Sequence, residues 1–367
     1  MTPVYLDYNA TAPMRPEAIA AWNDAAVQPG NASSVHFFGR QARKRVELAR
    51  DHVARLIGAR ATQVVFTGSG TEANNLVLRG SAGREILVSA VEHDSILQTA
   101  PGAVRIAVDA DGLVRAEAFD LALKQSAAPK LVSVQLANNE TGVLQDVAKL
   151  AVRAHEAGAW VHCDAVQAVG KVPVNFAALG IDLLSVSAHK MGGPQGVGAL
   201  VVADPIQLLP VLTGGGQERG RRAGTENVAG IAAFGAAAEA AQHDLAKYAA
   251  LSQWRDRIER EIMQRVPAAR TYGRGVARLP NTVCLGCPGL AAETQVMALD
   301  LDGIAVSAGS ACSSGKVRAS HVLKAMGLTD AEASSAIRIS LGWGTQEADI
   351  DRFVAAWCTL ASRRGAA

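Results

Sequence analysis

A lysine at the end of an apolar run is the first residue of this chain with the features of a nucleophile. Lys190 closes the tetrad Ser187-Ala188-His189-Lys190, which lies at the end of the apolar run 183–187. A lysine that a buried strand carries into a crevice loses charge through desolvation, and its neutral amine can then attack a carbonyl group. A solvated loop lysine would look the same in isolation. The role of Lys190 therefore depends on the residues around it.

A carboxylate follows another apolar run and gives Lys190 a chemical partner. Asp164 ends the run 160–163, and Gln167 lies about one helical turn farther on. Pyridoxal phosphate (PLP) needs a carboxylate that keeps its pyridinium nitrogen protonated, because only then is the ring an effective electron sink. Gln167 could reach the phenolic oxygen of such a ring. Asp164 could instead cap a helix N-terminus without any cofactor. Together, Lys190 and Asp164 favour a PLP site.

A glycine-containing turn and a histidine extend this hypothesis. The turn Gly68-Ser69-Gly70-Thr71 precedes a helical stretch, and free N–H groups at a helix N-terminus bind phosphate. The turn lacks the third glycine of a dinucleotide fingerprint and the Gly-Lys-Ser/Thr of a P-loop. His93 follows its own strand and could stack on an aromatic ring or transfer a proton, or it could be structural. Each signal is weak by itself.

The second half of the chain supplies a thiol and a buried cation. Cys312 lies within the small-residue segment 307–315, where a thiol is accessible enough to act as a nucleophile, although a small buried cysteine in a turn is the alternative. Arg338 lies within an apolar strand and needs an anion if it is buried, so a substrate carboxylate is an attractive partner.

Two other groups of residues have simpler interpretations. Cys284-x-x-Cys287 provides only two of the four ligands of a structural zinc site, so packed cysteines are favoured over zinc or a redox dithiol. The basic residues of segment 40–50, Arg40, Arg43, Lys44, Arg45 and Arg50, are expected to form a solvated helix face. The glycine-rich segments 214–219 and 224–227 suggest a loop over the active site or at a subunit boundary.

The elements that position these residues recur along the chain as apolar runs that end in polar residues. Such runs cover 63–66, 85–89, 131–135, 160–163, 183–187 and 198–202. Stretches of helical character separate several of them, for example 146–157. This alternation predicts a mostly parallel sheet covered by helices, with its ligands at the carboxyl ends of the strands. The polar residues that end the runs should therefore converge on one crevice.

The pattern changes after residue 241 and predicts a second, smaller domain. We expect one long helix over 244–265, strands near 282–285 and 337–341, and a helix near 292–301. The predicted fold class is α/β, with residues 13–245 forming a large cofactor-binding domain. Residues 1–12 and 246–367 would form a small α+β domain that carries the cysteine loop.

The composition fits a soluble enzyme of this size. The chain has 367 residues, of which 49% are hydrophobic and 19% charged, and its net charge of +2 gives no reason to expect a nucleic-acid or membrane partner. Five cysteines, an odd number, argue against a disulfide framework. The N-terminal residues do not look like a secretory signal, so we expect a cytoplasmic protein.

Taken together, these segments resemble the NifS/IscS-like cysteine desulfurases, which belong to the class V aminotransferase branch of PLP fold type I. The resemblance extends through nearly the whole chain, and its motifs are Leu6-Asp7-Tyr8-Asn9-Ala10-Thr11, Gly30-Asn31-Ala32-Ser33-Ser34-Val35-His36, Gly70-Thr71-Glu72, Glu92-His93, Asn138-Asn139-Glu140-Thr141-Gly142, Asp164-Ala165-Val166-Gln167, Ser187-Ala188-His189-Lys190, Gly224-Thr225-Glu226-Asn227, Gly309-Ser310-Ala311-Cys312 and Ile337-Arg338-Ile339-Ser340-Leu341-Gly342. The order and spacing of these motifs make the resemblance specific.

The resemblance implies a role for each matching residue. The cofactor phosphate would be bound by Gly70, Thr71, Ser187 and His189, with Thr225 contributed by the other subunit of a homodimer. The ring would be held by His93, Asp164 and Gln167, and Lys190 would carry the cofactor. Asn139 would contact both cofactor and substrate, and Arg338 the substrate carboxylate. Lys190, Cys312 and His93 would be the catalytic residues.

The reaction that the resemblance implies is the removal of sulfur from L-cysteine, giving L-alanine and a persulfide on Cys312. A sulfur acceptor such as an iron–sulfur scaffold protein would take up that sulfur. No resident metal is implied, although Cys312 would transiently ligate an iron–sulfur cluster during transfer. The chain departs from the family at Ala319, where a proline is common, and at Gln195, where a lysine is common.

Two alternatives remain open at this point. The first is a selenocysteine lyase or another class V PLP enzyme on the same scaffold. The second is a non-catalytic sulfur-relay or assembly protein, against which the joint presence of Lys190, Asp164 and His93 argues.

Overall fold

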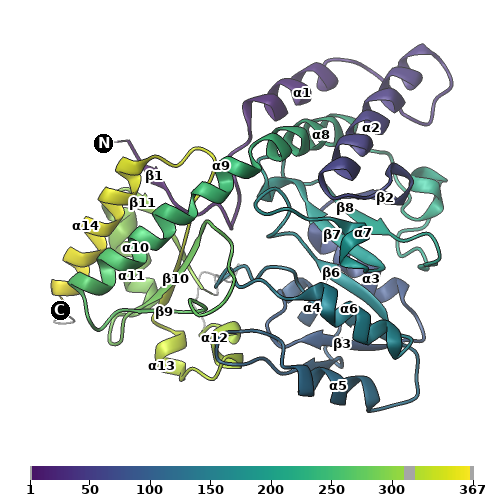
Figure 1. Ribbon diagram of the computed structural model, residues 1–367. Helices are drawn as coiled ribbons and strands as arrows, with labels where there is room; N and C mark the ends of the chain where they lie inside the picture. The colour runs from purple at the N-terminus through teal and green to yellow at the C-terminus, as the bar shows by residue number, and fades with distance from the viewer. Residues whose placement is uncertain (1, 310–318, 364–367) are drawn as a thin grey trace.

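The described part of the chain folds around three separate sheets, shown in Figure 1. The computed structural model describes residues 2–309 and 319–363. The largest sheet has seven strands in the spatial order β2 (Val64–Thr67), β8 (Gly198–Val202), β7 (Leu183–Ser187), β6 (Trp160–Asp164), β5 (Lys130–Ser133), β3 (Glu85–Ser89) and β4 (Val104–Ile106). A four-stranded sheet has the order β12 (Ser307–Ala308), β13 (Ala336–Ser340), β10 (Thr282–Gly286) and β9 (Arg270–Thr271), and β1 (Val4–Tyr5) pairs with β11 (Ile304–Ala305).

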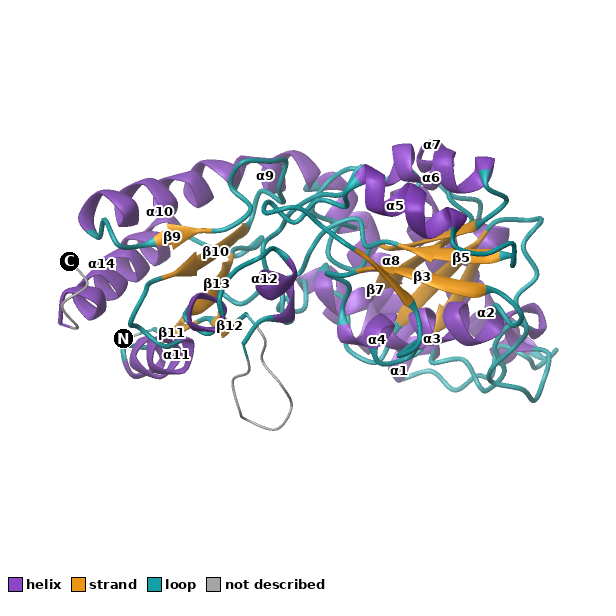
Figure 2. Ribbon diagram, turned by 90° about the horizontal axis from the view of Figure 1, so that it is seen from below, coloured by secondary structure: helices purple, strands orange, loops and turns teal. Residues whose placement is uncertain are grey.

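The seven-stranded sheet confirms the predicted α/β class. β4, β3, β5, β6 and β7 pair in parallel, and only the pairings of β8 with β7 and with β2 are antiparallel. Every residue of β2, β5, β7 and β8 is buried, because a sheet covered on both faces requires nearly continuous apolar strands. In Figure 2, α5, α6 and α7 lie on one face of this sheet and α3 and α4 on the other.

The helices alternate with the strands through the first part of the chain and then cover the smaller sheets. The earlier helices are α1 (Pro16–Ala26), α2 (Phe37–Leu56), α3 (Gly70–Gly80), α4 (Asp94–Leu97), α5 (Ala116–Lys124), α6 (Val147–Glu156), α7 (Phe176–Leu179) and α8 (Val228–His243). The later helices are α9 (Leu245–Ala250), α10 (Ser252–Arg265), α11 (Ala292–Leu301), α12 (His321–Ala325), α13 (Asp330–Ala333) and α14 (Glu347–Arg363). In the described part of the chain, no helix combines the length and the apolar character needed to cross a bilayer.

The predicted single helix over 244–265 is wrong in one respect, because it is divided at Leu251 into α9 and α10. Ser252 follows the break, and its Oγ donates to the Ala249 carbonyl at 2.8 Å. A serine hydroxyl that bonds a backbone carbonyl in the preceding turn competes with the regular helical pattern. The apolar periodicity continues across the break, which is why the sequence did not indicate it.

Arg50 corrects the expectation of a solvated basic helix face. Its side chain is buried on α2, and its guanidinium donates to the Glu218 carboxylate at 2.7 and 2.9 Å. Glu218 also accepts the Phe66 N–H at 3.0 Å. Glu218 and Arg219 both have positive φ values, 47° and 60°, which are costly for residues with a side chain. The buried pair therefore holds a strained segment of the glycine-rich loop against β2.

The smaller sheets have a core of their own. Leu6, Ile258, Ile339 and Trp357 belong to this second hydrophobic cluster, which is distinct from the main cluster around the seven-stranded sheet. Figure 1 shows the first strand, β1, and the last helix, α14, on the side of these smaller sheets. We therefore propose the same division that the sequence predicts, with a large domain of residues 13–245 and a small domain of residues 1–12 and 246–367.

Candidate active site

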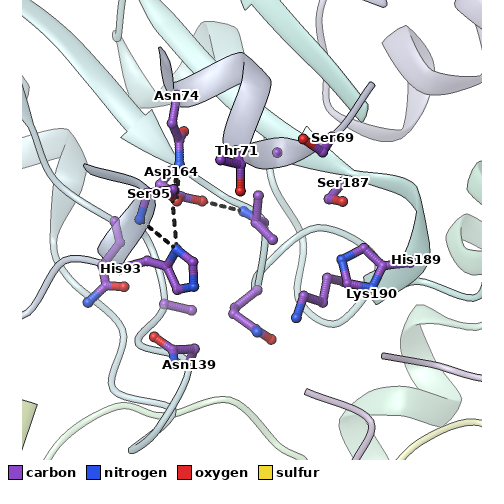
Figure 3. Close-up of a pocket in the computed structure, with 15 residues that line it drawn as sticks. Ser69, Thr71, Asn74, His93, Ser95, Asn139, Asp164, Ser187, His189 and Lys190 are labelled. Carbon is purple, nitrogen blue, oxygen red and sulfur yellow. Dashed lines mark hydrogen bonds between the residues drawn. The ribbon is translucent and has the colours of Figure 1, made fainter. Parts of the chain in front are cut away.

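The carboxyl ends of the strands in the large sheet surround a cavity of about 230 Å³. Its lining includes these residues singled out from the sequence: Gly70, Thr71, His93, Asn139, Asp164, Gln167, Ser187, His189 and Lys190. Figure 3 shows Lys190 and His189 on one side of the cavity, His93 and Asn139 on the other, and Thr71 between them at the start of α3. Residues more than 100 positions apart meet here because parallel strands end at the same edge of the sheet.

Lys190 reaches the cavity at the end of a short 3-10 helix, Ala188–Lys190, that directly follows β7. Its Nζ donates to the main-chain oxygens of Asn9 at 2.6 Å and Ala10 at 2.8 Å. Burial lowers the pKa of the Lys190 amine from 10.5 to about 7, with a further lowering from the positive charge of Arg338. A large share of Lys190 is therefore a neutral nucleophile at neutral pH.

Asp164 ends β6 and presents a firmly held carboxylate to the cavity. Its Oδ2 accepts from Asn74 Nδ2 at 2.8 Å, and its Oδ1 accepts from the Val166 N–H at 3.0 Å. The bond from Val166 means that Asp164 caps the turn that follows it. Asp164 therefore both caps this turn and lines the cavity. Each oxygen keeps lone-pair capacity that can accept a further donor, such as a pyridinium N–H.

One ring nitrogen of His93 is held by hydrogen bonds, and these bonds determine whether the other ring nitrogen carries a proton. Its Nδ1 accepts from the Ser95 N–H at 3.1 Å and lies 2.9 Å from Ser95 Oγ. Ser95 Oγ accepts from Asn74 Nδ2 at 2.8 Å, so its own proton is directed at Nδ1. Burial lowers the pKa of the His93 imidazole, which favours the neutral ring. The ring proton therefore resides on Nε2.

One end of the cavity is built to receive an anion. Gly70 and Thr71 begin α3, and their N–H groups make no hydrogen bond within the described residues. A Cβ on Gly70 would lie 2.8 Å from Val166 Cγ2, so only glycine fits at this close approach. Ser187 Oγ is also buried without a partner among the described residues. A buried unpaired hydroxyl costs free energy, and a phosphate oxygen would satisfy it.

His189 and Gln167 complete the cavity wall near Lys190. His189 Nδ1 lies 3.2 Å from Thr11 Oγ1, and burial together with the charge of Lys190 lowers the pKa of the His189 imidazole to about 4. Gln167 Nε2 donates to the Asn9 carbonyl at 2.9 Å. His189 is therefore a neutral hydrogen-bonding group at physiological pH.

The donor and acceptor set of this cavity fits PLP. The N–H groups of Gly70 and Thr71 and the Ser187 hydroxyl, which has no partner among the described residues, provide phosphate ligands at one end. Asp164 provides the carboxylate that a pyridinium nitrogen needs, and Lys190 provides an amine with a lowered pKa for a covalent bond to the aldehyde. The phosphate, the ring nitrogen and the aldehyde of the cofactor thus each have a suitable partner in this cavity.

Arg338 lines a second, adjoining cavity of about 210 Å³, which shares Lys190 and Asn139 with the first. Its Nη2 pairs with Asp7 Oδ1 at 2.8 Å, and its Nη1 donates to the Asn139 carbonyl at 3.1 Å. Arg338 Nε has no partner in the described part of the chain. Arg338 therefore already has one anion, Asp7, which sequence reasoning missed, and keeps a free N–H for a second.

The structure leaves the predicted roles of two site residues untested. Thr225 is exposed and does not line either of them. Cys312 lies outside the described residues, in the segment 310–318. The roles suggested for Thr225 and Cys312 therefore remain predictions.

The Cys284-x-x-Cys287 pair is packed into the interior. Both side chains are fully buried, and the two residues belong to different hydrophobic clusters. Burial raises the pKa of both thiols, which makes them poor nucleophiles. No group of three or more His, Cys, Asp or Glu residues suited to a metal ion occurs in residues 2–309 and 319–363.

Sequence reasoning missed three polar residues that hold the site together. Asn74 links Asp164 to Ser95, as Figure 3 shows, and its position four residues after Gly70 on the same helix was a usable signal. Asn9 and Lys171 both form hydrogen bonds with Gln167. Asn9 belongs to the motif of residues 6–11, although no role was assigned to it, and Lys171 gave no signal.

The family model "Aminotransferase class-V" matches residues 4–353. A protein of Cereibacter sphaeroides named cysteine desulfurase is 44% identical, over 96% of this chain and 94% of that protein. Cysteine desulfurase IscS of Dictyoglomus turgidum is 39% identical, over 95% of this chain and 92% of that protein. The X-ray structure of a NifS-like protein from Rickettsia africae superposes with a TM-score of 0.92 at 36% identity, covering 98% of this chain and 99% of that one.

Proposed function

The chain belongs to the class V aminotransferase family and, within it, to the cysteine desulfurases, and from this premise we propose a reaction and a role for each site residue. It is a PLP-dependent enzyme. Its reaction removes sulfur from L-cysteine and yields L-alanine and a persulfide on Cys312. The observation that carries this assignment is the convergence of Lys190, Asp164, His93 and Ser187 on one cavity.

The residues of the cavity divide between the two ends of the cofactor. Gly70, Thr71, Ser187 and His189 would bind the phosphate, while His93, Asn139, Asp164, Gln167 and Lys190 would hold the ring. PLP, when bound, supplies an electron sink for the charge that develops at the substrate Cα. Asp164 would maintain that capacity because its carboxylate would keep the ring nitrogen protonated. Gln167 would donate to the phenolic oxygen of the ring.

The protein groups around the substrate orient it and move its protons. The free Nε of Arg338 and the side chain of Asn139 bind the carboxylate of cysteine. The neutral Lys190 amine accepts the Cα proton, which its pKa of about 7 permits near neutral pH. His93, neutral and with its proton on Nε2, can donate a hydrogen bond into the cavity.

Cys312 takes the sulfur. Its thiolate attacks the sulfur of bound cysteine, an S–S bond forms, and the Cβ–S bond breaks. Sulfur is oxidised to the persulfide level while the carbon skeleton is reduced and protonated to alanine, so the step needs no external oxidant or reductant. The product persulfide is then open to attack by the thiol of an acceptor.

We further propose a cytoplasmic homodimer that passes its sulfur to an acceptor such as an iron–sulfur scaffold protein. The exposed position of Thr225, away from the cavities of its own chain, supports a role in the partner subunit. The four described cysteines are buried free thiols, as expected in a reducing compartment. Analytical ultracentrifugation tests the dimer, and persulfide transfer to a co-purified protein tests the acceptor.

The decisive experiment separates Cys312 from the other thiols. Cys312→Ala should retain the near-visible absorption of bound PLP but lose sulfide and alanine production from L-cysteine by a factor of 100 or more, roughly the effect of removing a covalent nucleophile. Cys358→Ala, a change on α14 remote from both cavities, is the matched control and should keep its activity. Full desulfurase activity in Cys312→Ala would refute the persulfide mechanism.

A further inference from the structure

Lys171 is a fully buried lysine beside the cavity, and none of the roles above uses it. It is 1% exposed, and its Nζ donates to Asn9 Oδ1 at 2.6 Å and to Gln167 Oε1 at 2.7 Å. Both acceptors are neutral amide oxygens, and no carboxylate of the described residues lies within ion-pair distance. Burying an amine without a counter-charge is costly, so we look for the function of Lys171 in its two hydrogen-bond partners, Asn9 and Gln167.

The three residues form a closed ring of hydrogen bonds. Lys171 binds Gln167 Oε1, Gln167 Nε2 donates to the Asn9 main-chain oxygen at 2.9 Å, and Asn9 Oδ1 accepts from Lys171. A main-chain oxygen can only accept, so it requires the NH2 end of the Gln167 amide. Lys171 donates to the opposite end. The two anchors together allow one orientation of this amide, with the second N–H of Nε2 left for the cavity that Gln167 lines.

We propose that Lys171 is a positioning residue that holds the Gln167 amide with an N–H, and not the C=O, directed at the phenolic oxygen of bound PLP. The inference rests on the role proposed above for Gln167. Without Lys171, Gln167 Oε1 would be a buried acceptor with no partner, and the single remaining contact to the Asn9 oxygen would no longer hold the amide in a fixed position. The donor to the phenolic oxygen would then be misplaced or replaced by an oxygen lone pair.

The charge state of Lys171 is compatible with this role. Burial lowers its pKa well below the ordinary value, and the positive charge of Lys190 lowers it further. A neutral amine keeps two N–H groups, one for each of its two acceptor oxygens. Lys171 can therefore hold Gln167 without placing a second positive charge beside Lys190.

The consequence is measurable in the titration of the Lys190–cofactor bond. When protonated, the nitrogen of that bond shares its proton with the phenolic oxygen. A donor from Gln167 competes for the same oxygen, weakens that sharing and keeps the pKa of the nitrogen low. Loss of the donor should raise the pH midpoint by about one unit, because a hydrogen bond to a charged group is worth roughly tenfold or more in an equilibrium constant.

The experiment is a double-mutant cycle on the PLP-loaded enzyme. Lys171→Met removes the donor at similar side-chain volume, Gln167→Ala removes its target, and the double variant combines both. We would record the absorption midpoint between pH 5 and 10 and the dissociation constant of PLP by equilibrium dialysis of the apoenzyme. Lys149→Met, at a lysine that is 84% exposed on α6, is the matched control. Lys171→Gln, whose amide is one bond too short to reach both oxygens, replaces Lys171→Met if the latter does not fold.

Lys171→Met should raise the midpoint by about one pH unit and weaken PLP binding about tenfold, and the change should vanish in the Gln167→Ala background. An unchanged midpoint in folded, PLP-loaded Lys171→Met would overturn the proposal, and so would an equal shift with and without Gln167. If the wild-type protein binds no PLP, the proposed function fails before the cycle begins, so the two failures are distinguishable.

Discussion

The reactivity of Lys190 gives the most direct test of the electrostatics of this site. Its pKa falls from 10.5 to about 7, mainly because the amine is buried and next because Arg338 is close. At pH 7 about half of such an amine is neutral, whereas an ordinary lysine is neutral at roughly one part in three thousand. In the apoenzyme, Lys190 should therefore react with a small acylating reagent near pH 7 roughly a thousandfold faster than its exposure alone predicts.

The assay is competitive trace labelling of the apoenzyme between pH 5 and 10, with Lys190 identified by peptide mass spectrometry. A blocked free lysine in the same sample serves as the reference for an unperturbed amine. Labelling of Lys190 should reach its half-maximum near pH 7. Exchange of Arg338→Met should raise that midpoint, because a positive charge that opposes protonation is lost, and Asp164→Asn should lower it, because a negative charge that favours protonation is lost. A wild-type midpoint above pH 9 would refute the reasoning.

Two further predictions concern buried carboxylates. Burial raises the pKa of Glu92 to about 8, so its contribution to stability is complete below the unfolded value near 4.5 and is lost as the pH rises through 8. Glu92→Gln keeps the acceptor for the Gln135 N–H. In scanning calorimetry, this variant should melt at a higher temperature than the wild type at pH 9 but not at pH 5. Equal differences in melting temperature at both pH values would contradict the prediction. Arg50→Met leaves the Glu218 carboxylate buried without its cation, and it should lower the free energy of unfolding in urea by about 3–5 kcal/mol. Adding Glu218→Gln should restore part of this loss. A loss below about 1 kcal/mol would contradict the importance of this pair.

The fold and the composition of the cavity followed from one regularity in the sequence. Apolar runs that end abruptly in polar residues predicted β3, β6 and β7, and parallel strands bring such ends together. His93, Asp164 and Lys190 therefore line one cavity although they are spread over about 100 residues. Periodicity cannot report where a helix is interrupted by a side-chain hydrogen bond, so the break at Leu251 was missed.

The polar support of the site could not be read from the sequence because it consists of single long-range contacts. Lys171 lies 162 residues from Asn9 in the chain, and in a turn such a lysine has the same local pattern as a solvated one. Arg50 was assigned to a solvated face because its partner, Glu218, is 168 residues away. Neither contact produces a period or a motif, so only the tertiary structure shows that these two basic side chains are buried and which groups they contact.

The N-terminal arm, residues 7–10, contains the acceptors that allow Lys190 to leave its resting position at little cost. The Asn9 main-chain oxygen accepts hydrogen bonds from both Lys190 and Gln167, so it remains paired when Lys190 moves toward a cofactor. The second acceptor, the Ala10 oxygen, belongs to an exposed residue and can be solvated instead. A buried acceptor left without a hydrogen bond costs about 1–3 kcal/mol. Because the Asn9 oxygen keeps its bond from Gln167, this cost does not arise when Lys190 moves away. The same arm carries Asp7, which pairs with Arg338, so one short segment sets both the charge beside Lys190 and the hydrogen bonds that it exchanges.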